Sequence, residues 1–267
     1  MLQMDRRACL IAALLMALAL SITAIGNELV RRAAQQASRK SRRLLLGAEQ
    51  RLFVTQFPDA PSVAEFAADL SDEELAGWHR MPRYTATGSL LTCLSRELRE
   101  ELHAWHAEAT RHPEPNSGHL TGHIELANLA GSPLERRLRE YLQDLMEQWT
   151  GEHELEWSNS YGPRTYHRGA KLAAHGDRIA THALSAIVYI GEEESIQPWP
   201  LQFVHVGAKE QDKVQLAVFS FEQDVLLYES TQPHGRIWPL QGEAYSAVFF
   251  HWRPRGWTEA AAALTGY

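Results

Sequence analysis

The chain has 267 residues, enough for one catalytic-sized domain with an extension or for two small domains. Its hydrophobic content of 45% and charged content of 22% are ordinary for a globular protein with a large buried core. The net charge of -7 is uneven: residues 1–43 carry eight Lys/Arg against two Asp/Glu, and the acidic remainder speaks against nonspecific nucleic-acid binding, which needs a basic surface.

The N-terminal segment is predicted to be a membrane anchor or a signal peptide. Residues 9–26 are apolar except for Ser21 and Thr23, and two arginines precede them. Such a run can just cross a bilayer as a helix. The basic start, the apolar centre and the small residues Ala24 and Gly26 also fit a cleaved signal peptide. We favour the uncleaved anchor.

The segment that follows the apolar run, up to residue 43, is basic and prone to form a helix. Six Lys/Arg follow the run and two precede it, so the positive-inside rule predicts a cytosolic body. The basic residues could contact anionic headgroups or form a solvated stalk. Only Cys93 lies outside the apolar run, so the body has no intrachain disulfide framework.

Residues 44–150 are predicted to be a helical region that supports the core. Leucines and a tryptophan recur at helical spacing within residues 94–105, and a second helix begins at Ser132 and Pro133 and ends at Gly151. We expect the apolar stripe of the second helix to pack on a sheet. That stripe consists of Leu134, Leu138, Leu142 and Met146.

The histidines of this region are predicted to be exposed rather than to bind metal. His103 and His106 are three residues apart on the first helix, but no third ligand accompanies them. His112, His119 and His123 lie in a loop rich in Pro and Gly. We expect these three side chains to be solvated.

From residue 151 to residue 255 the pattern changes to short β-rich segments. They are separated by turn sequences such as "GEEES" and "GAKEQD". Several short strands at this spacing predict an antiparallel sandwich or barrel. Residues 256–267 are predicted to be a C-terminal tail.

Two histidines and one aspartate in this β-rich part are candidate metal ligands. His175 and Asp177 are two residues apart in "KLAAHGDRIATH", and His234 follows the segment "DVLLYES" 59 residues later. On facing strands of a small jelly roll, these three side chains can converge on one face of a metal ion. Two imidazoles and one carboxylate leave coordination positions open and suit non-haem Fe(II).

Residues 155–254 resemble the Fe(II)/2-oxoglutarate dioxygenases, in particular the branch like prolyl 4-hydroxylases. The residues before His175 match that family's Tyr-x-x-Gly-x-Lys pattern, and "DVLLYES" with the following His-Gly is similar to its Gly-Asp-Ala-Leu-Leu-Phe strand and distal His. The resemblance implies an α+β fold: a double-stranded β-helix (jelly roll, cupin-like) behind an N-terminal helical layer. The matching positions are Tyr166, Gly169, Lys171, His234, Gly235 and Gly242.

The resemblance also implies an activity. His175, Asp177 and His234 would hold Fe(II), 2-oxoglutarate would chelate the iron, and O2 would take the last position. The product would be a hydroxylated aliphatic carbon, with a prolyl residue of a peptide or protein as the expected target. Tyr166 would hydrogen-bond the cosubstrate, and ascorbate would serve as reductant.

The sequence departs from the family at one position of consequence. The family usually anchors the distal carboxylate of 2-oxoglutarate with Lys or Arg nine or ten residues past the distal His, where this chain has Glu243 and Ala244. A buried dicarboxylate without a cationic partner is costly. Arg236 is therefore the first candidate for this role, followed by Arg253 and Lys171.

Other polar residues of the β-rich part have no clear role in sequence. The segment "PRTYHR" places Arg164, His167 and Arg168 near the expected mouth of the barrel, where they could meet an acidic or peptide substrate or form a solvated strand edge. His182, His205 and His251 are predicted to be structural histidines rather than ligands.

Location and partners follow from the resemblance together with the N-terminus. They imply a single-pass protein of the endoplasmic reticulum membrane with a lumenal catalytic domain. One alternative is secretion after cleavage of the N-terminal segment. The other is a cytosol-facing domain, which the charges that flank the apolar run favour. The expected partner is a peptide or protein substrate, and oligomeric state does not follow. Two other functions stay open: a metal-bound interaction module without catalysis, and an oxygenase of a free small molecule.

Overall fold

The computed structural model of the protein describes residues 63–66, 68, 70, 88–191, 199–204, 214–219 and 223–257. All of these residues belong to one compact unit, Gln50–Tyr267. The predicted anchor and most of the predicted tail lie outside them, as does His205. Within the described residues, no helix combines the length and apolar character needed to cross a membrane.

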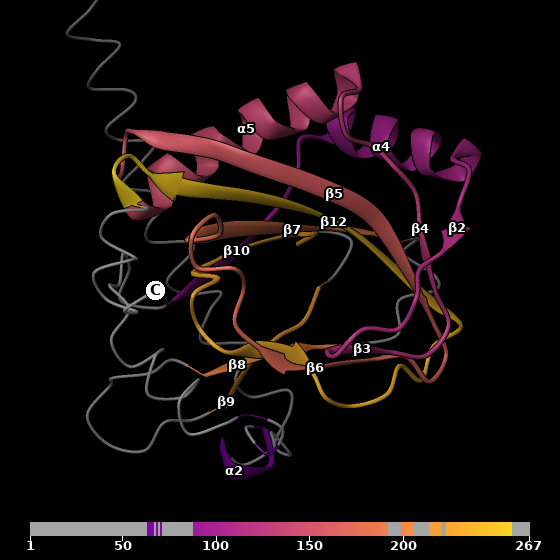
Figure 1. The fold of residues 1–267 in the computed structure, drawn as a ribbon. Helices are drawn as coiled ribbons and strands as arrows, with labels where there is room; N and C mark the ends of the chain where they lie inside the picture. Colours follow the sequence, from indigo (N-terminus) through magenta and orange to yellow (C-terminus); the bar gives the residue numbers. More distant parts are fainter. Residues whose placement is uncertain are drawn as a thin grey trace, which may run out of the picture. The chain divides into compact units, whose positions relative to one another are not determined.

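Two antiparallel sheets face each other and enclose the core (Figure 1). The larger sheet has the order β1 (Ser89–Thr92), β10 (Val225–Tyr228), β7 (Leu184–Ile190), β12 (Ala244–Pro254), β5 (Leu155–His167), β4 (Ile124–Leu126) and β2 (His112–Pro113). The smaller sheet has the order β3 (Leu120–Thr121), β6 (Lys171–His175), β11 (His234–Arg236), β8 (Leu201–Val204) and β9 (Val214–Ala217).

The order of the strands along the chain makes this pair of sheets a jelly roll. From β5 onward the chain passes repeatedly between the sheets: β5, β7, β10 and β12 belong to the larger one, and β6, β8, β9 and β11 to the smaller one. Adjacent strands are antiparallel throughout the paired strands described, including the long pair of β5 and β12. The expected double-stranded β-helix architecture is therefore present in this part of the chain.

Two helices lie on the outer face of the larger sheet (Figure 1). Helix α4 (Arg96–Glu108) begins after Ser95, whose hydroxyl accepts a hydrogen bond from the Leu98 amide. Helix α5 (Pro133–Thr150) begins after Ser132 and ends at Gly151, which has a left-handed φ of 80°. These caps satisfy backbone groups that a helix end leaves unpaired. Farther along the chain's N-terminal side, α2 (Val63–Phe66) is a single short turn of helix.

The region expected to be helical also contributes four strands to the sheets. Strands β1 and β2 form the two edges of the larger sheet, and β4 lies between β2 and β5. Strand β3 is an edge of the smaller sheet. Each has two to four residues. Segments this short show no alternation of apolar and polar residues, so the sequence pattern gave no indication of them.

The space between the sheets is filled by large apolar side chains. Inward-facing residues of both sheets and the adjoining loops form one buried cluster with many aromatic members. Its aromatic part lies around Tyr166, Trp199, Phe219 and Tyr245, whose rings contact one another. The barrel is thus packed and aromatic near the end of β11 that carries Arg236, whose guanidinium lies over three of these rings.

Strands β6 and β11 pair unusually closely. His234 lies opposite His175, but Arg236 lies opposite Leu172, so β6 contains one extra residue, a β-bulge. Gly235 faces this bulge. A Cβ atom at Gly235 would lie 2.9 Å from the Leu172 carbonyl oxygen, closer than real Cβ atoms come, and 3.0 Å from that of Ala173, tighter than nine in ten real contacts. Only glycine allows this approach.

Replacing Gly235 by alanine is expected to destabilise the fold. The added methyl group meets backbone atoms of β6, which cannot move without disturbing the ladder, and overpacking of this kind costs about 1–3 kcal/mol. The measurement is the urea midpoint of unfolding. Gly118→Ala is the matched control, because no atom beyond its own chain neighbours lies within 4 Å of the position its Cβ would take. Equal midpoints for both variants and the unmodified protein would contradict the close approach.

Candidate metal centre

Strands β6 and β11 bring the three predicted ligands together. His175 ends β6, Asp177 follows it by two residues, and His234 begins β11 directly opposite His175. The Asp177 Oδ1 atom lies 3.9 Å from His175 Nε2 and 3.7 Å from His234 Nε2. Two atoms that are each bound at about 2.1 Å to one ion lie at most about 4.2 Å apart. Both distances are therefore compatible with a shared metal ion.

Backbone carbonyls fix the orientation of both imidazole rings. The Nδ1 atom of His175 lies 2.8 Å from the Ala173 carbonyl oxygen, and that of His234 lies 2.8 Å from the Gln232 carbonyl oxygen. A carbonyl can only accept, so each Nδ1 must carry the proton and donate it. Each Nε2 is then an unprotonated lone pair that faces Asp177. This arrangement is typical of histidines that bind metal.

Burial keeps the two histidines neutral. It lowers the pKa of His175 to about 3, with a further contribution from nearby His234, and it lowers the pKa of His234 to about 4. Burial also raises the pKa of Asp177, and this effect outweighs the lowering by His175 and His182 and by the Tyr228 hydrogen bond. Two neutral nitrogen ligands beside a desolvated carboxylate form a site that a divalent cation would stabilise.

A hydrogen-bond chain runs from Asp177 into the larger sheet. The Tyr228 hydroxyl donates to Asp177 Oδ2 at 3.3 Å, and the Ser185 hydroxyl hydrogen-bonds Tyr228. The Ser185 oxygen lies 2.7 Å from His251 Nδ1. Because each hydroxyl has one proton, the direction that satisfies the chain is from His251 to Ser185 to Tyr228 to Asp177. The chain holds Oδ2, so Oδ1 is left to face the histidines.

Sequence reasoning missed Tyr228 and Ser185, and it assigned His251 a structural place only. Ser185 lies on β7, opposite both Tyr228 of β10 and His251 of β12. Their convergence depends on the order of three strands that are distant in sequence. The alternation within each strand indicates which residues point inward, but it does not indicate which strands are neighbours.

Arg236 is a buried cation beside this centre. It has no exposed surface, and its Nε donates to the Trp199 carbonyl at 3.2 Å while one terminal nitrogen donates to the Tyr245 hydroxyl at 2.7 Å. The other terminal nitrogen has no hydrogen-bond partner in the described residues. Its guanidinium also lies over the rings of Tyr245 and Trp199, at 4.6 Å and 4.9 Å.

A second buried arginine shows what Arg236 lacks. Arg164 forms two hydrogen bonds to the Glu114 carboxylate, Nε to Oε2 at 2.6 Å and a terminal nitrogen to Oε1 at 2.5 Å. Arg164 was expected to meet a substrate at the mouth of the barrel or to lie at a solvated strand edge. It is instead buried and paired with Glu114. No carboxylate pairs with Arg236 in the part of the chain that the structure describes. A buried cation without an anion is costly, so the Arg236 site suits an anionic ligand.

The other predicted contacts of 2-oxoglutarate lie in different surroundings. Tyr166 is fully buried beside Trp199, and its hydroxyl accepts a hydrogen bond from Arg164 at 3.2 Å. Lys171 is exposed on β6, opposite Thr121. Arg253 pairs with Glu156 at 3.2 Å on partly exposed surface. The structure therefore brings Tyr166 into the aromatic cluster around Arg236, and it does not bring Lys171 or Arg253 there.

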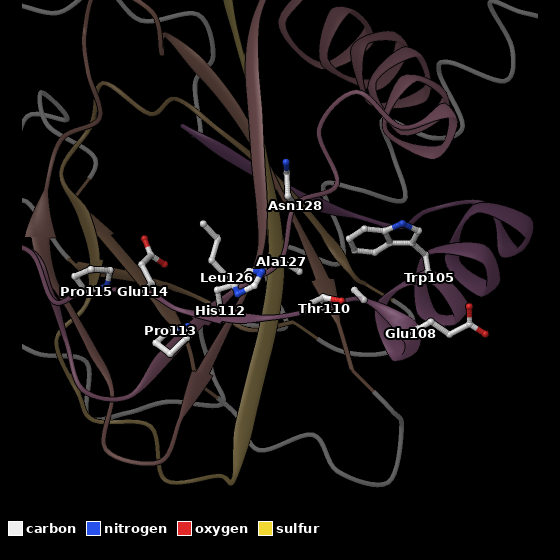
Figure 2. A pocket seen from close by; sticks show the side chains of 11 residues that line it. Trp105, Glu108, Thr110, His112, Pro113, Glu114, Pro115, Leu126, Ala127 and Asn128 are labelled. Atoms are coloured by element: carbon white, nitrogen blue, oxygen red, sulfur yellow. The ribbon is translucent and has the colours of Figure 1, made fainter.

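A separate hollow of about 620 Å³ lies between the end of α4 and strands β2 and β4 (Figure 2). The Trp105 side chain lies at the α4 side of this hollow, and Pro113 and Leu126 lie at the strand side. None of its lining residues belongs to the candidate metal centre. The hollow is therefore distinct from that centre.

Comparison with known proteins gives a likeness of fold. No protein-family model matches the sequence, and no curated protein matches it. An oxidoreductase of the 2OG-Fe(II) oxygenase family from Burkholderia pseudomallei has a TM-score of 0.50 and 8% identity, over 62% of this chain and 86% of that one. At this identity the likeness shows the fold alone, a jelly roll that this chain shares with that oxidoreductase.

Two further solved structures are similar at lower TM-scores. HygX from Streptomyces hygroscopicus, with nickel, 2-oxoglutarate and hygromycin B bound, has a TM-score of 0.46 and 16% identity over 70% of this chain and 88% of that one. A Pseudomonas putida prolyl-4-hydroxylase has a TM-score of 0.44 and 16% identity over 62% and 91%.

Acidification is expected to destabilise the metal-free protein. The folded pKa of His234, about 4, lies below its unfolded value of about 6.5. The unfolded state therefore binds more protons between these values, and the free energy of unfolding falls as the pH drops through this range. For His234 alone the loss from pH 7 to pH 5 is about 2 kcal/mol. Urea unfolding at both pH values measures it.

His234→Asn should lose less stability than the unmodified protein between pH 7 and pH 5, because it lacks one of the buried titrating groups. His153→Asn, at an exposed position between α5 and β5, is the control and should keep the full pH dependence. Identical pH dependence in the His234 variant and the control would show that His234 is not buried in its neutral form.

Removing the Tyr228 hydroxyl is expected to weaken metal binding by about 10- to 100-fold, the usual effect of losing a group that orients a metal ligand. Tyr228→Phe keeps the ring beside His234 and deletes the hydroxyl, with its hydrogen bonds to Asp177 and Ser185. Titration with Fe(II) or Ni(II) measures the affinity. Tyr141→Phe on α5, whose hydroxyl bonds the Cys93 carbonyl, is the matched control. Unchanged affinity in Tyr228→Phe would remove this residue from the site.

Proposed function

We propose that the protein is an Fe(II)- and 2-oxoglutarate-dependent oxygenase that hydroxylates an aliphatic C–H bond. One observation carries the proposal: the facial set of His175, Asp177 and His234 lies two residues along β11 from a buried arginine that lacks an anionic partner among the described residues. The two histidines and the aspartate suit Fe(II), and the buried arginine suits a dicarboxylate.

The three ligands would hold Fe(II) through two neutral imidazole nitrogens and one carboxylate oxygen. Bound iron supplies the oxygen chemistry that amino-acid side chains lack. The residues of the chain prepare the site: backbone carbonyls keep each Nε2 free, and Tyr228 orients the Asp177 carboxylate. The single carboxylate offsets part of the metal charge and leaves positions open for 2-oxoglutarate and O2.

Arg236 would bind the distal carboxylate of 2-oxoglutarate. His234 and Arg236 are two residues apart on one strand, so both point to the same face and their backbones are about 6.6 Å apart. A five-carbon dicarboxylate can extend over that distance. The free terminal nitrogen of Arg236 can donate to it, and Tyr245, which accepts from Arg236, keeps its own proton to donate. Tyr166 lines the same aromatic wall.

A prolyl residue of a peptide or protein is the proposed substrate, on the basis of the sequence resemblance over residues 155–254. An oxygenase of a free small molecule is the alternative. The other alternative is a metal-bound interaction module that no longer binds 2-oxoglutarate because it lacks the usual base after the distal His. The buried Arg236 supports the oxygenase over this module. Ascorbate is proposed as reductant, which stimulation of succinate release by ascorbate would test.

Location is proposed from the sequence of the N-terminus. The apolar run at residues 9–26 would attach the chain to the endoplasmic reticulum membrane with the catalytic domain in the lumen. Protease treatment of sealed microsomes tests this orientation. A lumenal domain is protected until detergent is added, whereas a cytosol-facing domain is degraded at once.

The anaerobic complex with Fe(II) and 2-oxoglutarate is expected to show a visible charge-transfer band. His175→Ala should abolish the band because it removes a ligand. Arg236→Ala should raise the 2-oxoglutarate concentration needed for half of the band at least tenfold, since it removes charge-assisted hydrogen bonds to the distal carboxylate. Arg253→Ala is the matched control and should leave that concentration unchanged.

The outcomes separate the functions. Iron binding without a band on adding 2-oxoglutarate would overturn the oxygenase proposal in favour of the interaction module. A band with unchanged 2-oxoglutarate dependence in Arg236→Ala would keep the oxygenase and move the carboxylate site elsewhere. Succinate release driven by proline-rich peptides, compared with the same peptides lacking proline, then tests the substrate.

A further inference from the structure

A second cluster of potential metal ligands lies at the junction of β4 and β5. His123 immediately precedes β4, Glu125 lies within it, and His167 is the last residue of β5. One ligand atom from each residue lies within 4.8 Å of the others. These three residues, here called the β4–β5 cluster, share no member with the candidate metal centre. His123 is exposed, and the other two side chains are each between a quarter and a third exposed.

The β4–β5 cluster has the ladder geometry of the candidate metal centre. In that centre a carboxylate follows a histidine by two residues, and the second histidine lies opposite the first on the antiparallel neighbour. In the cluster Glu125 follows His123 by two residues, and the amide of His167 donates to the carbonyl of His123 at 3.0 Å. The register pairs Ile124 with Tyr166, which places His123 opposite His167.

Strand periodicity explains why the three side chains meet. Residues at positions i and i+2 of a strand point to one face, and directly opposite residues on an antiparallel neighbour point to that same face. His123, Glu125 and His167 therefore project together, while Ile124 and Tyr166 between them point into the core. A His-x-carboxylate segment opposite a second histidine is enough to build a facial set of three ligands.

The contacts within the cluster show three groups already drawn together. The His123 and His167 rings stack with centroids 4.2 Å apart, and His167 Nε2 lies 2.9 Å from Glu125 Oε2. The hydrogen bond from His167 lowers the pKa of Glu125, with smaller contributions from His167 and His123 charge. The carboxylate is thus ionised, and the proton on His167 Nε2 occupies the place where a metal ion would bind.

We propose that His123, Glu125 and His167 form a second, solvent-accessible site for Zn²⁺ or a similar divalent transition metal, which joins the start of β4 to the end of β5. The ion replaces the His167 Nε2 proton, which is released or moves to Nδ1. Water completes the coordination of an open site of this kind.

The surroundings of the cluster define which metals it takes. Two nitrogens and one oxygen at an exposed site follow the general order of affinity, so Zn²⁺, Ni²⁺ and Cu²⁺ should bind more tightly than Fe(II). Arg111 also contributes to the lowered pKa of Glu125, so its charge acts at the site and reduces the affinity for a cation. The two sites should therefore differ, with the buried one better suited to iron and the exposed one to zinc.

Counting bound zinc on the full chain tests the proposal. The protein is stripped with a chelator, titrated with Zn²⁺ by calorimetry, and its bound metal is measured after gel filtration. His167→Ala and Glu125→Gln should each bind one ion fewer than the unmodified protein, as should His175→Ala through the other site. The double variant His167→Ala with His175→Ala should bind two fewer. His112→Ala on β2 is the matched control with an exposed histidine.

A second measurement separates loss of a ligand from loss of folding. Zn²⁺ should raise the melting temperature of His175→Ala, because an ion that binds only the folded state stabilises it. It should not raise that of the double variant. If His167→Ala and Glu125→Gln keep the full number of bound ions, or if Zn²⁺ stabilises the double variant as much as His175→Ala, the proposed site is overturned. Neither result depends on the proposed oxygenase activity.

Discussion

The close pairing of β6 with β11 is the constraint on which the candidate metal centre depends. It places His175 and His234 opposite each other, and the bulge in β6 adjusts the register so that Arg236 lies opposite Leu172. Gly235 makes the approach possible because it brings no side chain against the β6 backbone. If these strands moved apart, the two imidazoles would separate, and Asp177 would lose the pair of nitrogens it faces.

Burial gives this centre its chemistry. The histidines are neutral because desolvation opposes their protonation, and the backbone carbonyls that accept from Nδ1 leave both Nε2 atoms free. The same low-dielectric surroundings make the two buried arginines informative. Arg164 is neutralised by Glu114, whereas the described residues provide Arg236 with a carbonyl, a phenol and aromatic faces only. An incoming dicarboxylate would supply the missing charge.

The β4–β5 cluster uses the same arrangement in different surroundings. Antiparallel pairing with a period of two creates a facial set wherever a His-x-carboxylate segment meets a histidine opposite. Inside the barrel, such a set is largely buried, and its carboxylate is held by a hydrogen-bond chain of Tyr228, Ser185 and His251. At the β4–β5 junction it is hydrated and lies near Arg111. The strand pairing thus arranges both sets of ligands in the same way. Their chemistry differs because burial and neighbouring charge differ.

The two long helices and the candidate ligands could be predicted from the order of residues along the chain. Ser132, Pro133 and Gly151 mark the ends of α5 because capping is local chemistry. The spacing of His175, Asp177 and His234 indicated one metal centre, and the lack of a base after the distal His pointed to Arg236. Such features are readable because each depends on neighbouring residues or on a pattern of types along the chain.

Which of the candidate residues share an environment depends on the packing of the strands and could not be predicted from the sequence. The tertiary structure separated Arg236 from Lys171 and Arg253, paired Arg164 with Glu114, and added the short strands β1 to β4. His123 and His167 were expected to be solvated or to lie at a strand edge, and their pairing depends on the register of β4 against β5. Register and strand order arise from contacts between distant segments, and the alternation within one strand carries no information about its partner.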